Sequence, residues 1–371
     1  MATKRREYSI QYIGTRKSGN TKGVCPNLST NKPLNIMTQK KRISYIDVFR
    51  GLLMLLVVLG HSIGNTGDPV NRVILSFHMP AFFILSGMCF HPKANDYNAS
   101  LILKKKGKGL LWPYITFSVI GVALYWLLLA GTTKDKGVTV AQTLTGIFWN
   151  DGQYGTIVTN GFWFVYDLIW ISLIHVLTRK INRKIRLAFT TFSFFSLYLL
   201  RIDFYFSVEI IKILAGYVFF LIGDLFAASE MEKKLEKVIR GGYLCLSVSA
   251  LFATVTIAVS WNNEPILMYC NQYGNILLFL LSSISGTFSV YMLSRYIVSN
   301  KFVEFVGRNT IPILQMHFFV LMVTHVLWHK VIPTADNMAF PTYVLHFVVA
   351  VAACCIYSKV INRYCPWLVK L

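Results

Sequence analysis

Long apolar segments, separated by short polar ones, make up most of the chain from residue 44 onward. A helix that crosses a bilayer needs roughly 20 mostly apolar residues. The segments that meet this requirement are 44–64, 73–91, 110–130, 161–177, 187–206, 208–228, 241–261, 273–293, 310–328 and 342–361. The fifth is the weakest, because Arg201 and Asp203 interrupt it. The pattern predicts an all-α, polytopic membrane helical bundle of about ten transmembrane helices.

The distribution of Lys and Arg predicts the orientation of the bundle. If the N-terminus is cytoplasmic, the cytoplasmic segments together hold 30 Lys and Arg, whereas the outer loops hold 5. Short loops rich in Lys and Arg resist translocation across the membrane. The asymmetry therefore predicts that both termini are cytoplasmic in a multi-pass protein of the inner membrane.

Composition excludes several other classes of protein. Hydrophobic residues make up 54% of the chain and charged residues only 14%, well below the usual share in soluble domains. The net charge of +21 does not indicate nucleic-acid binding, because the basic residues lie in short runs between apolar spans. The seven Cys form no CxxC pair, so we expect buried, inert thiols and neither a metal site nor a disulfide framework.

The chain divides by composition into three parts. Residues 1–42 are polar and basic and lack the apolar core of a signal peptide, so we expect a cytoplasmic tail. Residues 43–361 form the membrane domain, and residues 362–371 form a second cytoplasmic tail. Because a compact basic start at Met37 runs directly into the first span, we also expect that translation begins there.

Three ionisable residues lie in the first predicted span. Arg50 and His61 are eleven residues apart, close to three helical turns, so they share one face at a separation of about 16 Å. Asp47 lies one turn before Arg50 on nearly the same face. Such groups inside a membrane are costly and by default indicate function. A simpler interpretation stays open: Asp47 and Arg50 form an anchoring ion pair, and His61 is an interhelical hydrogen bonder.

The second predicted span adds another histidine. His78 lies near its outer end, at about the depth of His61. Pro80 falls in the first turn of this span, where a missing N–H costs little. Ser86 and Gly87 are small enough to let another helix approach closely. Two histidines at one depth on consecutive antiparallel spans predict a shared site.

These two spans resemble the acyltransferase-3 family of membrane acyltransferases, and most closely its fucose 4-O-acetylase-like branch. In the family's first span an Asp is followed by a basic residue and then by a His eleven positions later, as in Asp47, Arg50 and His61. Its second-span string is matched by Phe77-His78-Met79-Pro80-Ala81-Phe82-Phe83-Ile84-Leu85-Ser86-Gly87, in which Ala81 departs from the pattern. That branch often has Lys where this chain has Arg50.

Shorter similarities extend the resemblance from residue 42 to about residue 361. They are Leu111-Trp112-Pro113-Tyr114, Phe162-Trp163-Phe164 and Gly307-Arg308-Asn309-Thr310 followed by His317. The resemblance implies transfer of an acetyl or other short acyl group from cytosolic acyl-coenzyme A to a sugar hydroxyl. The implied acceptor is a cell-surface glycan or its lipid-linked precursor, and no cofactor is bound permanently.

The roles expected for the residues follow from this activity. His61 is the general base, Arg50 holds the phosphates or pantetheine of coenzyme A, and Asp47 orients Arg50. A covalent acyl-His61 intermediate is an alternative route. The candidate substrate-binding residues are His78, Ser86, Trp163, Asn309 and His317.

Other intramembrane polar residues are expected to be structural. Glu209 and Lys212, one turn apart, predict an ion pair, and we assign no role to His325, His329 or His346. Two competing functions use the same spans. One is a transporter or flippase that moves a glycan or small anion past these charges, and the other is a non-catalytic partner of a glycan synthase.

Overall fold

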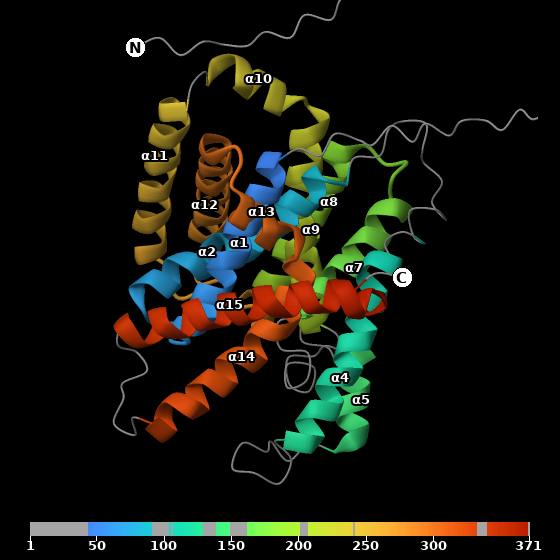
Figure 1. The fold of residues 1–371 in the computed structure, drawn as a ribbon. Coiled ribbons are helices and arrows are strands. Elements are labelled where there is room, and N and C mark those ends of the chain that lie inside the picture. The colour runs from blue at the N-terminus through green and yellow to red at the C-terminus, as the bar shows by residue number, and fades with distance from the viewer. Residues whose placement is uncertain are drawn as a thin grey trace, which may run out of the picture. The chain divides into compact units, whose positions relative to one another are not determined.

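The computed structural model describes residues 44–90, 104, 107–128, 139–148, 162–200, 207–239, 242–331 and 340–369 (Figure 1). The chain divides into two units, 1–42 and 43–371, and all of the described residues belong to the second. The expected tail and the expected start at Met37 therefore lie outside the described residues.

The described residues form helices and contain no strand. The elements are α1 (Ser44–Ile63), α2 (Pro69–Met88), η1 (Gly107–Leu111), α4 (Trp112–Leu128), α5 (Val140–Phe148), α7 (Trp163–Leu177), α8 (Arg183–Leu199), α9 (Ser207–Ala228), α10 (Met231–Val238), α11 (Gly242–Trp261), η2 (Met268–Cys270), α12 (Ile276–Ile297), α13 (Lys301–Arg308), α14 (Thr310–Val331), α15 (Phe340–Tyr364) and η3 (Pro366–Leu368).

The predicted all-α polytopic membrane bundle is confirmed. Within the described ranges, 8 helices are long and apolar enough to cross a membrane. The fourth predicted span corresponds to α7, a shorter apolar helix of 15 residues. The fifth corresponds to α8, which has 17 residues and begins with basic ones, so its place in the bilayer stays a prediction. The last helix continues past the predicted boundary at 361 to Tyr364.

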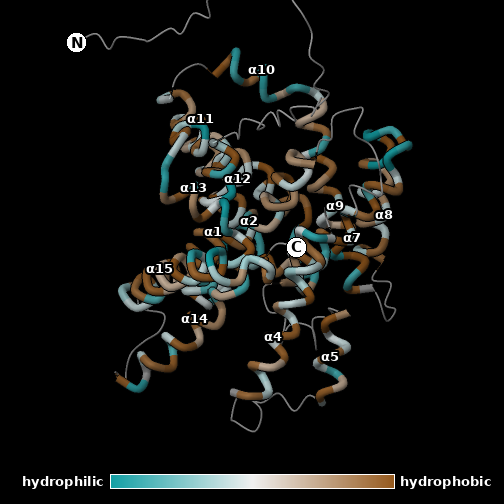
Figure 2. Tube along the Cα trace, turned by 45° about the vertical axis from the view of Figure 1, so that its right-hand side comes forward, coloured by the Kyte–Doolittle hydropathy of each residue, from teal (hydrophilic) through white to brown (hydrophobic). Residues whose placement is uncertain are grey.

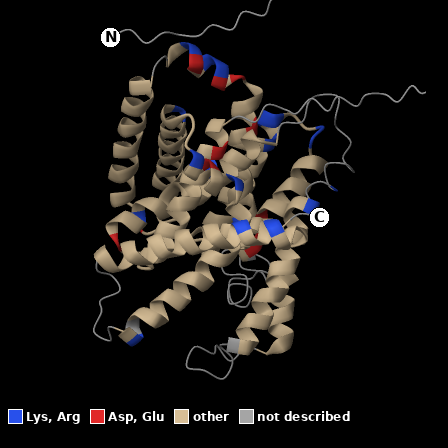
Figure 3. Ribbon diagram, in the orientation of Figure 1, with Lys and Arg blue, Asp and Glu red and all other residues tan. Residues whose placement is uncertain are grey.

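Polar residues gather at one end of the bundle. Figure 2 shows α10 and the start of α8 as hydrophilic, whereas α4, α5 and most of α14 are hydrophobic. Figure 3 shows the same division, with many Lys and Arg residues around α10 and few along α4 or α14. The orientation of the bundle in the membrane stays a prediction.

The first span lies at the centre of the bundle and contacts α2, α12, α13, α14 and α15. Its contact with α13 is unusually close, because glycines meet backbone there. A Cβ on Gly51 would lie 2.1 Å from the carbonyl oxygen of Val303, and one on Gly307 would lie 1.9 Å from that of Asp47. Only residues without a side chain fit at these two positions.

A second glycine contact joins α2 to α9. A Cβ on Gly87 would lie 1.9 Å from the carbonyl oxygen of Phe220, and one on Gly223 would lie 2.0 Å from that of Ile84. The close helix approach predicted at Ser86 and Gly87 is therefore confirmed, with α9 as the partner. Close backbone approach through small residues is typical of helices that associate in lipid.

The predicted position of Pro80 is wrong. Asp68 accepts hydrogen bonds from the N–H groups of Val70 and Asn71, so α2 begins at Pro69 and Pro80 lies in its interior. A proline there leaves the carbonyl four residues earlier, that of Ser76, without its usual donor. The hydroxyl of Ser283 on α12 donates to that carbonyl at 3.0 Å. The break in the α2 ladder is thus repaired by a neighbouring helix.

Candidate active site

A cavity of about 240 Å³ lies beside the first half of α1. Arg50 lines it, together with Cys89 and Ser86 from the end of α2 and apolar residues of α7 and α14. We call it the arginine cavity. The Arg50 side chain is 30% exposed, and its Nη2 lies 4.0 Å from Cys89 Sγ. Cys89 is itself exposed, so the expectation that the thiols are buried is wrong at this position.

A second cavity, of about 270 Å³, lies beside the last turns of α1. His61 and His78 line it, and so do Trp163 from α7 and Tyr269 from the segment before α12. We call it the histidine cavity. Partial burial raises the pKa of the Tyr269 phenol, which therefore keeps its proton near neutral pH.

The two cavities meet end to end. Val57 of α1, Met79 of α2 and Leu314 of α14 line both of them, and we call these three residues the neck. Arg50 lies on one side of the neck and His61 on the other, both on the face of α1 that the helical period predicts. The guanidinium and the imidazole therefore lie in neighbouring cavities divided by three apolar side chains, and we call the two cavities together the path.

Three histidines gather at the far end of this path. His61, exposed to the histidine cavity, has its ring centre 5.2 Å from that of His317 and 4.4 Å from that of Phe318. His78 is buried, with Nδ1 2.7 Å from the carbonyl oxygen of Ile74. Since a carbonyl can only accept, that nitrogen carries the hydrogen and Nε2 of the neutral ring keeps its lone pair.

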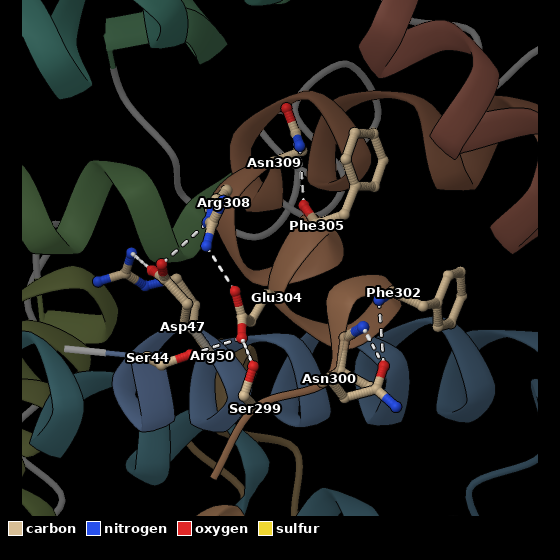
Figure 4. A network of polar contacts seen from close by, with 11 residues as sticks. Ser44, Asp47, Arg50, Ser299, Asn300, Phe302, Glu304, Phe305, Arg308 and Asn309 are labelled. Carbon is tan, nitrogen blue, oxygen red and sulfur yellow. Dashed lines mark hydrogen bonds and ion pairs between the residues drawn. The ribbon is translucent and has the colours of Figure 1, made fainter. Parts of the chain in front are cut away.

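Asp47 lies at the opposite end, in a network that joins α1 to α13 (Figure 4). The Nε of Arg308 donates to Asp47 Oδ2 at 3.1 Å, while Arg50 Nη1 lies 3.9 Å from Oδ1. A second nitrogen of Arg308 donates to Glu304 Oε2 at 2.5 Å. The 2% exposed Asp47 is thus flanked by two guanidinium groups, and the closer one comes from α13.

Glu304 anchors this network. The hydroxyls of Ser299 and Ser44 donate to its Oε1 at 2.6 and 2.5 Å. These two hydrogen bonds, with the charge of Arg308, hold the pKa of the Glu304 carboxyl below its ordinary value. The carboxylate stays ionised and keeps Arg308 turned toward Asp47.

Buried charges lie behind the Trp163 wall of the histidine cavity. Lys212 Nζ lies 5.8 Å from the centre of the Trp163 ring and 2.8 Å from Glu209 Oε1, so the predicted ion pair is confirmed. Asp167, fully buried one turn after Trp163, interacts electrostatically with Lys212. These buried charges hold the Trp163 ring in place from the side away from the cavity. The assignment of Trp163 to substrate binding stays a prediction.

Three of the candidates have hydrogen bonds within the protein or are buried behind the site. The Ser86 hydroxyl donates to its own helix at the Phe82 carbonyl, at 2.7 Å. Asn309 joins α13 to α14, where its side chain donates to the carbonyl of Phe305 and accepts from Asn362. His317 is buried behind His61 and lines neither cavity. Their roles in substrate binding stay predictions.

Arg308, Asp167 and Asp224 were missed in the sequence analysis. Arg308 stands within a stretch that resembles the family, and Asp167 interrupts an apolar span, which is itself a signal of function or of a buried partner. Asp224 binds Arg183 at 2.9 Å and Arg186 at 3.6 Å, an ion-pair network that connects α8 to α9. In each case the signal was present, but the partner lies on another helix.

The fold and the site define a multi-pass membrane protein with ionisable groups along one internal face of its central helix. Comparison with known proteins identifies the family to which this membrane protein belongs. The chain matches the model of a family described as an acyltransferase domain over residues 43–359, and it belongs to that family of membrane acyltransferases. No curated protein and no solved structure matched the chain.

Proposed function

We propose that this membrane acyltransferase moves an acetyl or other short acyl group from acyl-coenzyme A to a sugar hydroxyl. The observation that supports it is the pair of cavities that meet at the neck, with Arg50 at one end and His61 at the other. The proposed location is the inner membrane, where the donor is cytosolic and the acceptor is a cell-surface glycan or its lipid-linked precursor.

The donor occupies the arginine cavity. A guanidinium pairs well with phosphate, and Arg50 is partly exposed there. An extended pantetheine arm is comparable in length to the separation of about 16 Å along α1 between Arg50 and His61. The arm passes the neck, and its thioester carbonyl comes to lie beside His61.

The reaction is a direct transfer. His61 accepts the proton of the acceptor hydroxyl as the oxygen attacks the thioester carbonyl. The C–S bond breaks as the new C–O ester bond forms, and the thiolate of coenzyme A leaves and takes up a proton. Trapping of labelled acetyl on the protein without acceptor would favour the acyl-His61 route instead.

The test uses membranes that contain the protein, labelled acetyl-coenzyme A and extracted glycan. We expect acetylated glycan with the natural protein and none with His61→Ala, because the acceptor hydroxyl loses the base that takes its proton. His325→Ala is the control, since that histidine lines neither cavity. Activity of His61→Ala equal to that of the natural protein would end the assignment. Movement of glycan across the membrane without acylation would favour a transporter.

Donor binding is measured separately through Cys89, which lines the arginine cavity next to Arg50. In a variant that keeps only this cysteine, acetyl-coenzyme A should slow alkylation of the thiol by a maleimide. Arg50→Gln should remove that protection, whereas Arg50→Lys should keep part of it. Equal protection in all three proteins would place the donor elsewhere.

A further inference from the structure

His317 stands apart from the other histidines of the site. Its side chain is fully buried on α14, whereas its neighbours Leu314 and Phe318 line the histidine cavity. A side chain that lines neither cavity is badly placed to contact an acceptor sugar directly. It is well placed to act on the residue that it touches, which is His61.

The hydrogen bonds of His317 fix its tautomer. Nδ1 lies 3.1 Å from the carbonyl oxygen of Ile313 and 2.8 Å from that of Leu314. Carbonyl oxygens only accept, so Nδ1 carries the hydrogen and Nε2 of the neutral ring is an acceptor. Among the residues that the structure describes, this buried Nε2 has no hydrogen-bond partner. An unsatisfied buried acceptor is costly, so this nitrogen needs an explanation.

His61 is the imidazole within reach of that acceptor. Its ring centre lies 5.2 Å from that of His317, and the ring planes are inclined by 41°. Two imidazoles joined by an N–H···N bond of about 2.9 Å have their ring centres about 5 Å apart. The observed separation therefore already suits such a bond, and a rotation of the His61 ring about its side-chain bonds would align the two nitrogens.

We propose that His317 is a positioning residue for His61, with Nε2 accepting the N–H of the catalytic imidazole. This role rests on the proposed function. It selects the His61 tautomer whose other nitrogen offers a lone pair to the acceptor hydroxyl. When His61 takes the proton, the same hydrogen bond becomes charge-assisted and stabilises the imidazolium. His78, the other histidine near His61, is left free to face the cavity.

Two matched variants distinguish loss of the hydrogen-bond acceptor Nε2 from loss of the rest of the His317 ring. In His317→Gln, an amide oxygen replaces the acceptor near the position of Nε2. In His317→Asn, an amide N–H replaces Nδ1 and still reaches the backbone carbonyls, but nothing accepts from His61. We expect kcat to fall by about 100-fold in His317→Asn and by less than about tenfold in His317→Gln. The KM for acetyl-coenzyme A and the donor protection of Cys89 should not change.

A spectroscopic readout tests the same claim without turnover. Nitrogen-15 NMR of labelled histidines in nanodiscs should show one neutral tautomer for His61 in the natural protein and a mixture in His317→Asn. The His61 signal is assigned by its loss in His61→Ala. His346→Asn, a change of another buried histidine that lines neither cavity, should leave both kcat and the tautomer unchanged.

The outcomes distinguish this inference from the proposed function. If His61→Ala is inactive but His317→Asn has the kcat of the natural protein, the positioning role is wrong and the function stands. Equal losses in the Gln and Asn variants, with the His61 tautomer unaltered, would show that His317 acts only through packing. Full activity of His61→Ala would overturn the function itself.

Discussion

Arg308 donates from its Nε to Asp47 Oδ2 at 3.1 Å, and this bond ties the short helix α13 to the first turn of α1. The two residues are 261 positions apart in the sequence. Asp47 is nearly fully buried, so it needs this partner as well as Arg50. A residue from the far end of the chain thus binds the carboxylate beside which Arg50 lies.

Removing the Arg308 guanidinium should destabilise this junction. We expect Arg308→Gln to lower the free energy of unfolding in micelles by about 1–3 kcal/mol, because a buried carboxylate loses a hydrogen-bond donor. Asp47→Asn combined with Arg308→Gln should cost less than the sum of the two single changes. Lys301→Gln, which alters an exposed cation at the start of the same helix, should have little effect. Additive losses would contradict direct coupling.

The hydroxyl of Ser283 should contribute to the free energy of unfolding only because α2 contains a proline. Ser283→Ala leaves the Ser76 carbonyl without a donor and should cost about 1–3 kcal/mol of unfolding free energy. Ser282→Ala is the matched control, since that hydroxyl donates only within α12, to the carbonyl of Phe279. The same denaturant titration compares both variants.

The same interaction can be tested by restoring the lost donor. Pro80→Ala supplies an N–H that reaches the Ser76 carbonyl within the helix. In that background Ser283→Ala should cost no more than Ser282→Ala. If Ser283→Ala is equally costly with and without the proline, the hydroxyl serves another purpose.

Narrowing the neck should block transfer more than donor binding. Val57→Phe adds bulk where the two cavities meet, and we expect kcat to fall by about 100-fold because the thioester no longer reaches His61. Protection of Cys89 by coenzyme A should persist. Val73→Phe makes the same chemical change in a separate apolar groove, of about 570 Å³, on the other face of α1, and it should be nearly silent. Equal activity of the two variants would contradict passage through the neck.

Acidification should weaken the α1–α13 junction through Glu304. Its pKa in the folded protein is lower than its ordinary value of 4.5. The unfolded state therefore binds the proton more readily, so this carboxylate stabilises the fold above pH 4.5. That contribution is lost as the pH falls through the lowered value. Glu304→Gln should reduce the drop in thermal midpoint between neutral and acidic pH, whereas Glu264→Gln should not. An unchanged drop in Glu304→Gln would refute the role.

The sequence contained most of the site but not the partners that hold it. The helical period correctly predicted that Arg50 and His61 share a face, because spacing within one helix is a local property. The interior position of Pro80 was missed although Asp68 and Pro69 mark an earlier helix start. The hydrogen bond from Arg308 to Asp47 could not be predicted, since it depends on how α13 packs against α1 through Gly307 and Gly51. Spacing along one helix says nothing about such a crossing.

The apolar neck also has a consequence for the membrane itself. A constriction lined by Val57, Met79 and Leu314 offers no polar atom of a side chain to a hydrated ion or to a chain of water molecules. Hydrophobic constrictions of this kind prevent conduction by drying out. The protein can thus keep a guanidinium and an imidazole in neighbouring cavities inside the membrane without a continuous polar route for protons between them.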